Sequence, residues 1–207
     1  MSGLLINANS LNIPLADGSV QCVVTSPPYY GLRDYGVDGQ IGLEVTPDEY
    51  IANLVAVFRE CKRILRDDGT LWVNIGDSYA SNSDRAGMKL GAHNKGCQCS
   101  YCTMPTTGLK TTVPPGMKPK DLIGIPWMLA FALRADGWYL RQDIIWAKPN
   151  PMPESVKDRC TKSHEYIFLL SKSAKYYYDN EAVMEDAAGG RERFGGAKYG
   201  DKGLDKS

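Results

Sequence analysis

The sequence lacks long hydrophobic runs and lacks an excess of charge of either sign. None of its apolar stretches approaches the roughly 20 residues with which a helix crosses a bilayer. The N-terminus also lacks the basic-then-apolar pattern of a signal peptide. Both absences favour a soluble, intracellular protein, which we expect to be cytoplasmic. The 24 basic and 24 acidic side chains balance, which at first argues against a nucleic-acid partner.

The distribution of the charges is more informative than their sum. Residues 1–80 carry five basic and ten acidic side chains, whereas residues 81–120 carry six basic and one acidic, and 121–207 carry thirteen of each. A local basic segment can supply phosphate contacts in an otherwise neutral protein, although a solvated loop explains it equally well. The 207 residues, 43% of them hydrophobic, suffice for one domain with a real core.

A strand that ends abruptly is the most informative local feature. The β-branched run at 20–24 is followed by Thr-Ser-Pro-Pro-Tyr-Tyr at 25–30, and a prolyl pair cannot continue a strand ladder. We therefore expect a buried strand that ends at Ser26, with a rigid corner and an aromatic ring at its carboxyl end. In open α/β sheets, ligands bind at that end of the strands.

This corner offers hydrogen-bond acceptors and a flat face, without a strong nucleophile or an evident base. It suits a planar substrate with an amino group: the Ser26 hydroxyl and the Pro27 carbonyl accept the two amine hydrogens, and Tyr29 stacks on the ring. Two such acceptors stabilise the positive charge that grows on the nitrogen when it attacks. A base in a duplex must first leave the stack, and an aromatic side chain is a common support for it.

The next elements alternate in the order of an α/β protein. The sequence predicts a short first strand at 4–6 and a helix that begins at Thr46, with a capping box completed by Glu49. Apolar residues recur at helical spacing over 51–65, Asp-Asp-Gly at 67–69 stops the helix, and a parallel strand follows at 70–77. Asn74 and Asp77 should then lie near the sheet edge that carries Ser26.

Residues 80–118 change in character and predict a long inserted loop that is basic and contains cysteines. Long structureless loops in compact domains are usually functional or disordered. Four soft ligands lie within ten residues here, and they can form a small structural zinc knuckle: His93, Cys97, Cys99 and Cys102. The Cys-x-Cys spacing is less usual than Cys-x2-Cys, so an ordinary cysteine-containing loop remains the alternative.

The remaining pattern predicts a helix at 128–134, a strand at 138–146, a proline-stiffened loop at 148–155 and a strand at 164–170. Two strands in succession without a helix between them suggest an antiparallel pair near the end of the sheet. His164 begins the last strand, and a histidine in that place is more often structural than catalytic.

The motifs together resemble those of the amino-methylating DNA methyltransferases, the DNA methylase N-4/N-6 family, in its permuted order. The resemblance covers most of 3–180: Thr-Ser-Pro-Pro-Tyr at 25–29, Trp-x-Lys-Pro-Asn-Pro-x-Pro-x-Ser at 146–155 and Ser-His-Glu-Tyr at 163–166. It implies a Rossmann-like α/β sheet and a restriction-modification enzyme that transfers methyl from S-adenosylmethionine to a flipped-out base in double-stranded DNA. The Ser form of the motif is associated with cytosine N4, and the Asp form with adenine N6.

The resemblance also assigns roles to individual residues. Catalysis would fall to Ser26, Pro27, Pro28 and Tyr29. Asn9, where the family has an Asp, and Thr25 would contact the cofactor. The substrate would meet Asp77, Lys148 and Asn150.

The family's glycine-rich cofactor motif, Asp-Pro-Phe-x-Gly-x-Gly, is absent from this sequence. We therefore expect residues 1–180 to be the catalytic portion of a methyltransferase domain, 181–207 to be a flexible tail, and the sheet to be incomplete beside the strand at 20–24. The chain would be truncated, or one part of a split enzyme whose second chain carries the cofactor motif. The alternatives are an adenine-N6 enzyme on the same scaffold and a non-catalytic DNA-binding remnant that uses 81–120.

Overall fold

The computed structural model describes residues 3–80, 83–84, 110–111, 113–154 and 156–184. The chain forms two compact units, divided between Tyr177 and Tyr178. The first unit contains every helix and strand of the described residues. In the second, residues 178–184 form a turn in which the Asp179 carboxylate accepts a hydrogen bond from the amide of Ala182, at 3.0 Å.

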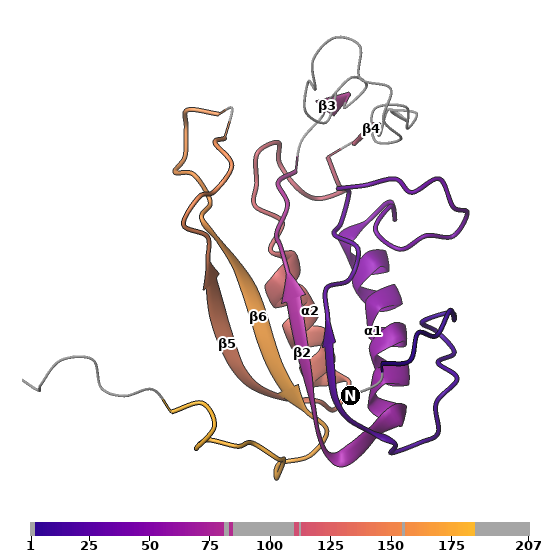
Figure 1. Ribbon diagram of the computed structural model, residues 1–207. Helices are drawn as coiled ribbons and strands as arrows, with labels where there is room; N and C mark the ends of the chain where they lie inside the picture. The colour runs from indigo at the N-terminus through magenta and orange to yellow at the C-terminus, as the bar shows by residue number, and fades with distance from the viewer. Residues whose placement is uncertain (1–2, 81–82, 85–109, 112, 155, 185–207) are drawn as a thin grey trace, which may run out of the picture. The chain divides into compact units, whose positions relative to one another are not determined.

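The first unit is built on a four-stranded mixed sheet in the order β1-β2-β6-β5 (Figure 1). The strands are β1 (Val20–Thr25), β2 (Leu65–Ile75), β6 (His164–Ser171) and β5 (Tyr139–Ala147). β1 runs parallel to β2, whereas β6 is antiparallel to both of its neighbours. The expected α/β sheet with an antiparallel pair near its end is thereby confirmed.

Two helices pack against each other and against one face of this sheet. α1 (Pro47–Ile64) begins as predicted: Thr46 Oγ1 accepts the amide of Glu49 at 3.2 Å, and the Glu49 carboxylate accepts the amide of Thr46 at 3.3 Å. α2 (Ile125–Ala135) follows the long insertion. Alternate strand residues point toward the helices and form the core with them, among them Leu71, Val73, Ile75, Phe168 and Leu170.

β1 lies at one edge of the sheet, where it pairs only with β2 among the described residues. Its side chains alternate, because Val23 packs against the core while Val24, on the opposite face, is 77% exposed. An exposed valine on an edge strand is a surface that favours association. The expected incomplete sheet is therefore observed in the described part of the chain.

Three local predictions are wrong. The strand before the prolyl pair is an edge strand and not the buried strand expected, since none of its six residues is buried. Residues 4–6 do not form a strand, and Leu5 is 99% exposed. A run of three apolar residues buries too little surface to hold a strand without a neighbour. The Asp-Asp-Gly segment at 67–69 does not separate helix from strand, because the backbone is already extended at Leu65 and these residues lie within β2.

The insertion contributes only two short strands to the described structure, β3 (Ser83–Asp84) and β4 (Lys110–Thr111), which pair antiparallel. The candidate zinc ligands, at positions 93, 97, 99 and 102, lie outside the described residues. The ranges that the structure does describe hold no group of three or more potential metal ligands. Neither described helix is long and apolar enough to cross a membrane.

Candidate active site

The corner that follows β1, residues 26–30, is held by hydrogen bonds from α1 and from the end of β2, and Ser26 within it is exposed. The hydroxyl of Tyr50, a fully buried residue of α1, donates to the Pro28 carbonyl at 2.7 Å. Ser78, just beyond β2, donates to the Tyr30 carbonyl at 3.0 Å. Tyr50 thereby occupies the carbonyl of Pro28 and leaves that of Pro27 as the candidate acceptor for substrate. The predicted corner is observed where β1 ends, at Thr25 and so one residue before Ser26.

Tyr50→Phe is expected to lower the free energy of unfolding by about 1–3 kcal/mol, because it leaves the Pro28 carbonyl without its donor. Urea denaturation followed by circular dichroism measures this. Tyr30→Phe is the matched control, since its hydroxyl donates to the Val45 carbonyl at 3.2 Å in an exposed setting and its loss should cost less. Equal losses in the two variants would contradict the anchoring role of Tyr50.

The Tyr29 hydroxyl lies at the centre of a polar network. It is 3.0 Å from Asn74 Oδ1 and 3.1 Å from Glu165 Oε2. The other oxygen of Glu165 forms an ion pair with Lys148, and the Asn74 amide nitrogen donates to the Tyr166 carbonyl at 3.2 Å. The prediction that Asn74 lies beside the Ser26 corner is confirmed.

This network holds Tyr29 neutral and Glu165 charged. Burial raises the pKa of Tyr29 above its usual value, a hydrogen bond from Ser26 opposes the rise, and the nearby Glu165 carboxylate adds to it. Burial alone would also raise the pKa of Glu165, but the ion pair with Lys148 and the Tyr29 hydrogen bond outweigh it and hold that pKa below its usual value. At neutral pH the phenol therefore donates and the carboxylate accepts.

Two glycines make room for Tyr29. A Cβ on Gly76 would lie only 2.6 Å from Cε2 of the Tyr29 ring, closer than real contacts allow. Gly42 has a φ of +107°, and a Cβ there would lie 3.1 Å from the Tyr29 carbonyl oxygen. Glycine is the residue for both a close approach and a left-handed backbone. The ring is thus closely confined on the side of Gly76.

The structure gives Asp77 a structural contact that the sequence did not reveal. Its Oδ1 accepts hydrogen bonds from the amides of Ser78, Gly124 and Ile125 at 2.9, 2.9 and 3.0 Å. A carboxylate there satisfies free amides at the start of α2 and is favoured by the helix dipole. This contact places Asp77 between β2 and α2, near the predicted edge of the sheet.

Lys148 and Asn150 are exposed in the loop that follows β5. Lys148 joins the corner through Glu165, and its amide donates to the Ser163 carbonyl at 2.7 Å, which closes the base of the loop. Sequence reasoning assigned no role to Glu165, Tyr50 or Gly76. Glu165 lies within the Ser-His-Glu-Tyr motif at 163–166, and that motif was the only available signal for it.

Asn9 and Thr25, assigned to the cofactor by resemblance, fit S-adenosylmethionine poorly by themselves. The Asn9 side chain accepts from the amide of Leu11 at 2.9 Å and so serves its own exposed turn. Thr25 offers one hydroxyl at the end of an edge strand. A ligand with a sulfonium, an adenine and an amino-acid group needs contacts on several sides, which these two donors do not provide.

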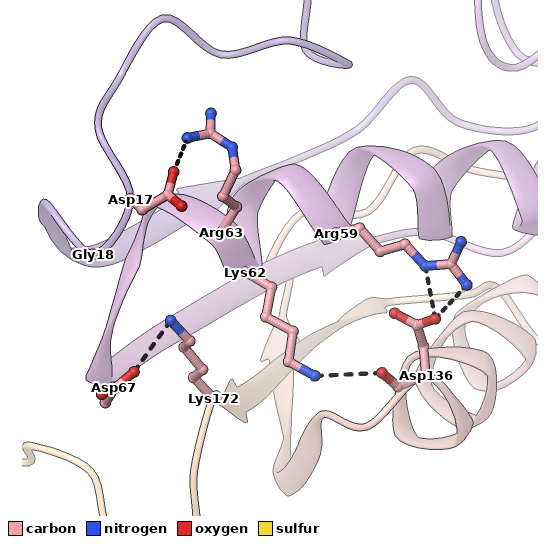
Figure 2. A pocket seen from close by; sticks show the side chains of 8 residues that line it. All are labelled: Asp17, Gly18, Arg59, Lys62, Arg63, Asp67, Asp136 and Lys172. Carbon is pink, nitrogen blue, oxygen red and sulfur yellow. Dashed lines mark hydrogen bonds and ion pairs between the residues drawn. The ribbon is translucent and has the colours of Figure 1, made fainter.

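A second charged site lies at the opposite end of the sheet and is structural (Figure 2). Arg59 pairs with Asp136 at 2.5 Å, and Lys62 donates to the carbonyls of Asp136 and Gly137 at 3.3 and 2.9 Å. These contacts join the C-terminal half of α1 to the residues that end α2. The other two cations of this pocket are also paired, Arg63 with Asp17 and Lys172 with Asp67. Because its cations already have partners, this pocket is not the candidate active site.

This four-stranded mixed sheet has a counterpart among solved structures. A solved structure of the cytosine-N4-specific PvuII DNA methyltransferase shares it, with a TM-score of 0.55 and 16% identity over 89% of this chain and 58% of that one. The sequence profile of the N6/N4 DNA methylases matches residues 20–194. This chain belongs to that DNA methylase family.

Curated relatives agree at much higher identity. The chain is 57% identical over 183 residues to the type II methyltransferase M.Cfr9I of Citrobacter freundii. This alignment covers 86% of this chain and 57% of the relative. It is 60% identical over 167 residues to M.SmaI of Serratia marcescens, covering 81% of this chain and 54% of the relative. The chain therefore spans a little over half the length of these relatives, and corresponds to the N-terminal part of the family's permuted order.

Proposed function

We propose that this chain is the catalytic part of a type II DNA methyltransferase that modifies the exocyclic N4 amine of cytosine in double-stranded DNA. The observation that carries the proposal is the corner at 26–29: Ser26 is exposed at the carboxyl edge of the sheet, while the turn beneath it is anchored by a buried tyrosine. Because its substrate would be cellular DNA, we place the protein in the cytoplasm.

The chain's own residues would bind and polarise the base. The Ser26 hydroxyl and the Pro27 carbonyl accept the two hydrogens of the exocyclic amine, which favours a pyramidal nitrogen and stabilises its growing positive charge. Pro28 stiffens the turn, and the Tyr29 ring supports the extruded base by stacking. S-adenosylmethionine, when bound, would supply the methyl group, with S-adenosylhomocysteine as the leaving group and one proton of the amine released.

We infer that residues beyond those described complete the cofactor site. The relatives extend well past the matched region, since the match covers 57% and 54% of their lengths. Among the described residues β1 pairs only with β2, so its other edge has no partner there, and Val24 on its open face is 77% exposed. We propose that a segment carrying the glycine-rich motif pairs there, from the same polypeptide or from a second chain.

Serine in the first position of the corner favours cytosine N4 over adenine N6. An assay of the modified nucleoside distinguishes these two specificities. The protein, expressed at the full length of its coding sequence, is incubated with unmodified genomic DNA and methyl-labelled S-adenosylmethionine. Digestion to nucleosides and mass spectrometry should then show N4-methylcytosine. N6-methyladenine as the sole product would refute the specificity and leave the reaction class intact.

The rival of a different class is a DNA-binding remnant without activity. Its basic segment, 81–120, has a net charge of +5 in sequence, so it would bind DNA with strong salt dependence. Binding of that kind with no methyl transfer, even when the cofactor-binding part of a relative is supplied in trans, would favour this rival and overturn the enzymatic proposal.

A further inference from the structure

We propose that Glu165 is a positioning residue for methyl transfer, because its carboxylate joins the Tyr29 hydroxyl to the Lys148 ammonium and fixes the Tyr29 ring beside Ser26. The inference rests on the proposed function and adds a residue to it. Glu165 is the second residue of β6 and lies opposite Trp146 of β5 in register. It reaches the corner from 136 positions further along the chain.

Each oxygen of the Glu165 carboxylate has its own partner. Oε2 accepts from the Tyr29 hydroxyl at 3.1 Å, and Oε1 forms the ion pair with Lys148. The Glu165 side chain is 21% exposed and that of Lys148 is 41% exposed. A pair that is partly withdrawn from water is screened less than a surface pair, and its geometry is better held.

The Tyr29 ring is therefore restrained at two places. Glu165 and Asn74 hold the hydroxyl at its tip, and Gly76 lies against its side, where even a methyl group would collide. A base that stacks on Tyr29 must use the side away from Gly76. Stacking contributes to catalysis only if the ring plane is fixed in advance, since misplacement of a reacting group by about 1 Å can cost about a hundredfold in rate.

The same contact acts on Ser26. The Tyr29 hydroxyl has a single proton, which goes either to Asn74 Oδ1 or to the Glu165 carboxylate. In both cases a lone pair of the phenolic oxygen remains to accept from the Ser26 hydroxyl. A Ser26 hydroxyl that donates to Tyr29 would keep the lone pairs of its oxygen for the amine hydrogens of the base. Glu165 thus acts on the substrate only through Tyr29 and Ser26.

Glu165→Gln preserves the shape of the side chain and one acceptor but removes the charge that pairs with Lys148. In full-length protein we expect its kcat to fall about tenfold or more, with the KM for DNA within about twofold of wild type. Glu154→Gln is the matched control, since Glu154 lies in the loop before β6 and pairs with Arg159 at 2.6 Å. Both of its constants should stay within about twofold, and thermal melting by circular dichroism checks that the variants are folded.

A second measurement does not depend on methyl transfer. The 207-residue chain is labelled with ¹³Cζ-tyrosine, its Tyr29 signal is assigned from Tyr29→Phe, and the phenol is titrated by NMR. Glu165→Gln should shift the Tyr29 pKa downward, since a carboxylate that favoured the neutral phenol is gone. Glu154→Gln should leave it unchanged.

The two readouts separate the inference from the function on which it rests. If no variant methylates DNA, the proposed function fails, and the titration alone still decides whether Glu165 holds Tyr29. An unchanged Tyr29 titration in Glu165→Gln overturns the positioning role. A raised KM with unchanged kcat also overturns it, because that result would make Glu165 and Lys148 a simple DNA-binding pair.

Discussion

Ser26→Ala is expected to lower the kcat of the full-length enzyme about 10²–10³-fold, the usual cost of losing one preorganised hydrogen-bond partner of the transition state. The hydroxyl is one of two acceptors that we assign to the exocyclic amine, and it stands exposed at the end of β1. Its removal should change the free energy of unfolding by about 0.5 kcal/mol or less, as for other exposed positions. Single-turnover transfer of labelled methyl to DNA measures the effect.

Ser19→Ala provides the matched control for this experiment. Ser19 precedes the opposite end of β1, where its hydroxyl donates to the Ala16 carbonyl at 2.6 Å. The same substitution there should leave kcat within about twofold of wild type. If Ser26→Ala also turned over at nearly the wild-type rate, Ser26 would have no part in polarising the amine.

Gly76→Ala is expected to lower kcat about 10–100-fold, because the added methyl collides with the Tyr29 ring and displaces it. The new Cβ would lie 2.6 Å from Cε2 and 3.1 Å from Cδ2 of that ring. Gly76 is not among the glycines with positive φ, so the backbone itself tolerates alanine. Overpacking of this buried position should also lower the free energy of unfolding by about 1–3 kcal/mol.

The cause of that loss can be isolated. Gly3→Ala, where a Cβ would meet nothing within 4 Å, should alter neither rate nor stability. In the double variant Gly76→Ala/Tyr29→Ala the collision is absent. Its loss in free energy of unfolding should therefore be smaller than the sum of the losses in the two single variants. If the two losses in free energy of unfolding were strictly additive, Gly76 and Tyr29 would not interact, and this explanation of how the Tyr29 ring is positioned would be wrong.

Local signals in the sequence were sufficient for the elements nearest the site. The capping box at Thr46 predicted where α1 begins, and the prolyl pair predicted where β1 ends, because caps and prolines act on their own neighbours in the chain. The prediction of a strand at 4–6 was wrong because strand formation depends on residues far away in the sequence. A strand exists only when another pairs with it, and Leu4 and Leu5 carry no information about that partner.

The contacts that fix the site come from far along the chain. Tyr50 reaches Pro28 across 22 positions, and Glu165 reaches Tyr29 across 136. The presence of a tyrosine or a glutamate does not by itself predict such a contact, because sequence spacing alone does not determine which distant residues pack together. Asp77 illustrates the same point, because its role at the start of α2 depends on where a helix 47 positions later begins.

The central claim, that an extruded cytosine rests on the corner at 26–29, is tested most directly by photochemical cross-linking. Full-length protein is irradiated with DNA in which 5-iodocytosine replaces cytosine, since a halogenated base bonds most readily to an aromatic ring stacked on it. Peptide mapping by mass spectrometry should place the principal cross-link at Tyr29. Cross-links confined to 81–120, with none at the corner, would contradict the account.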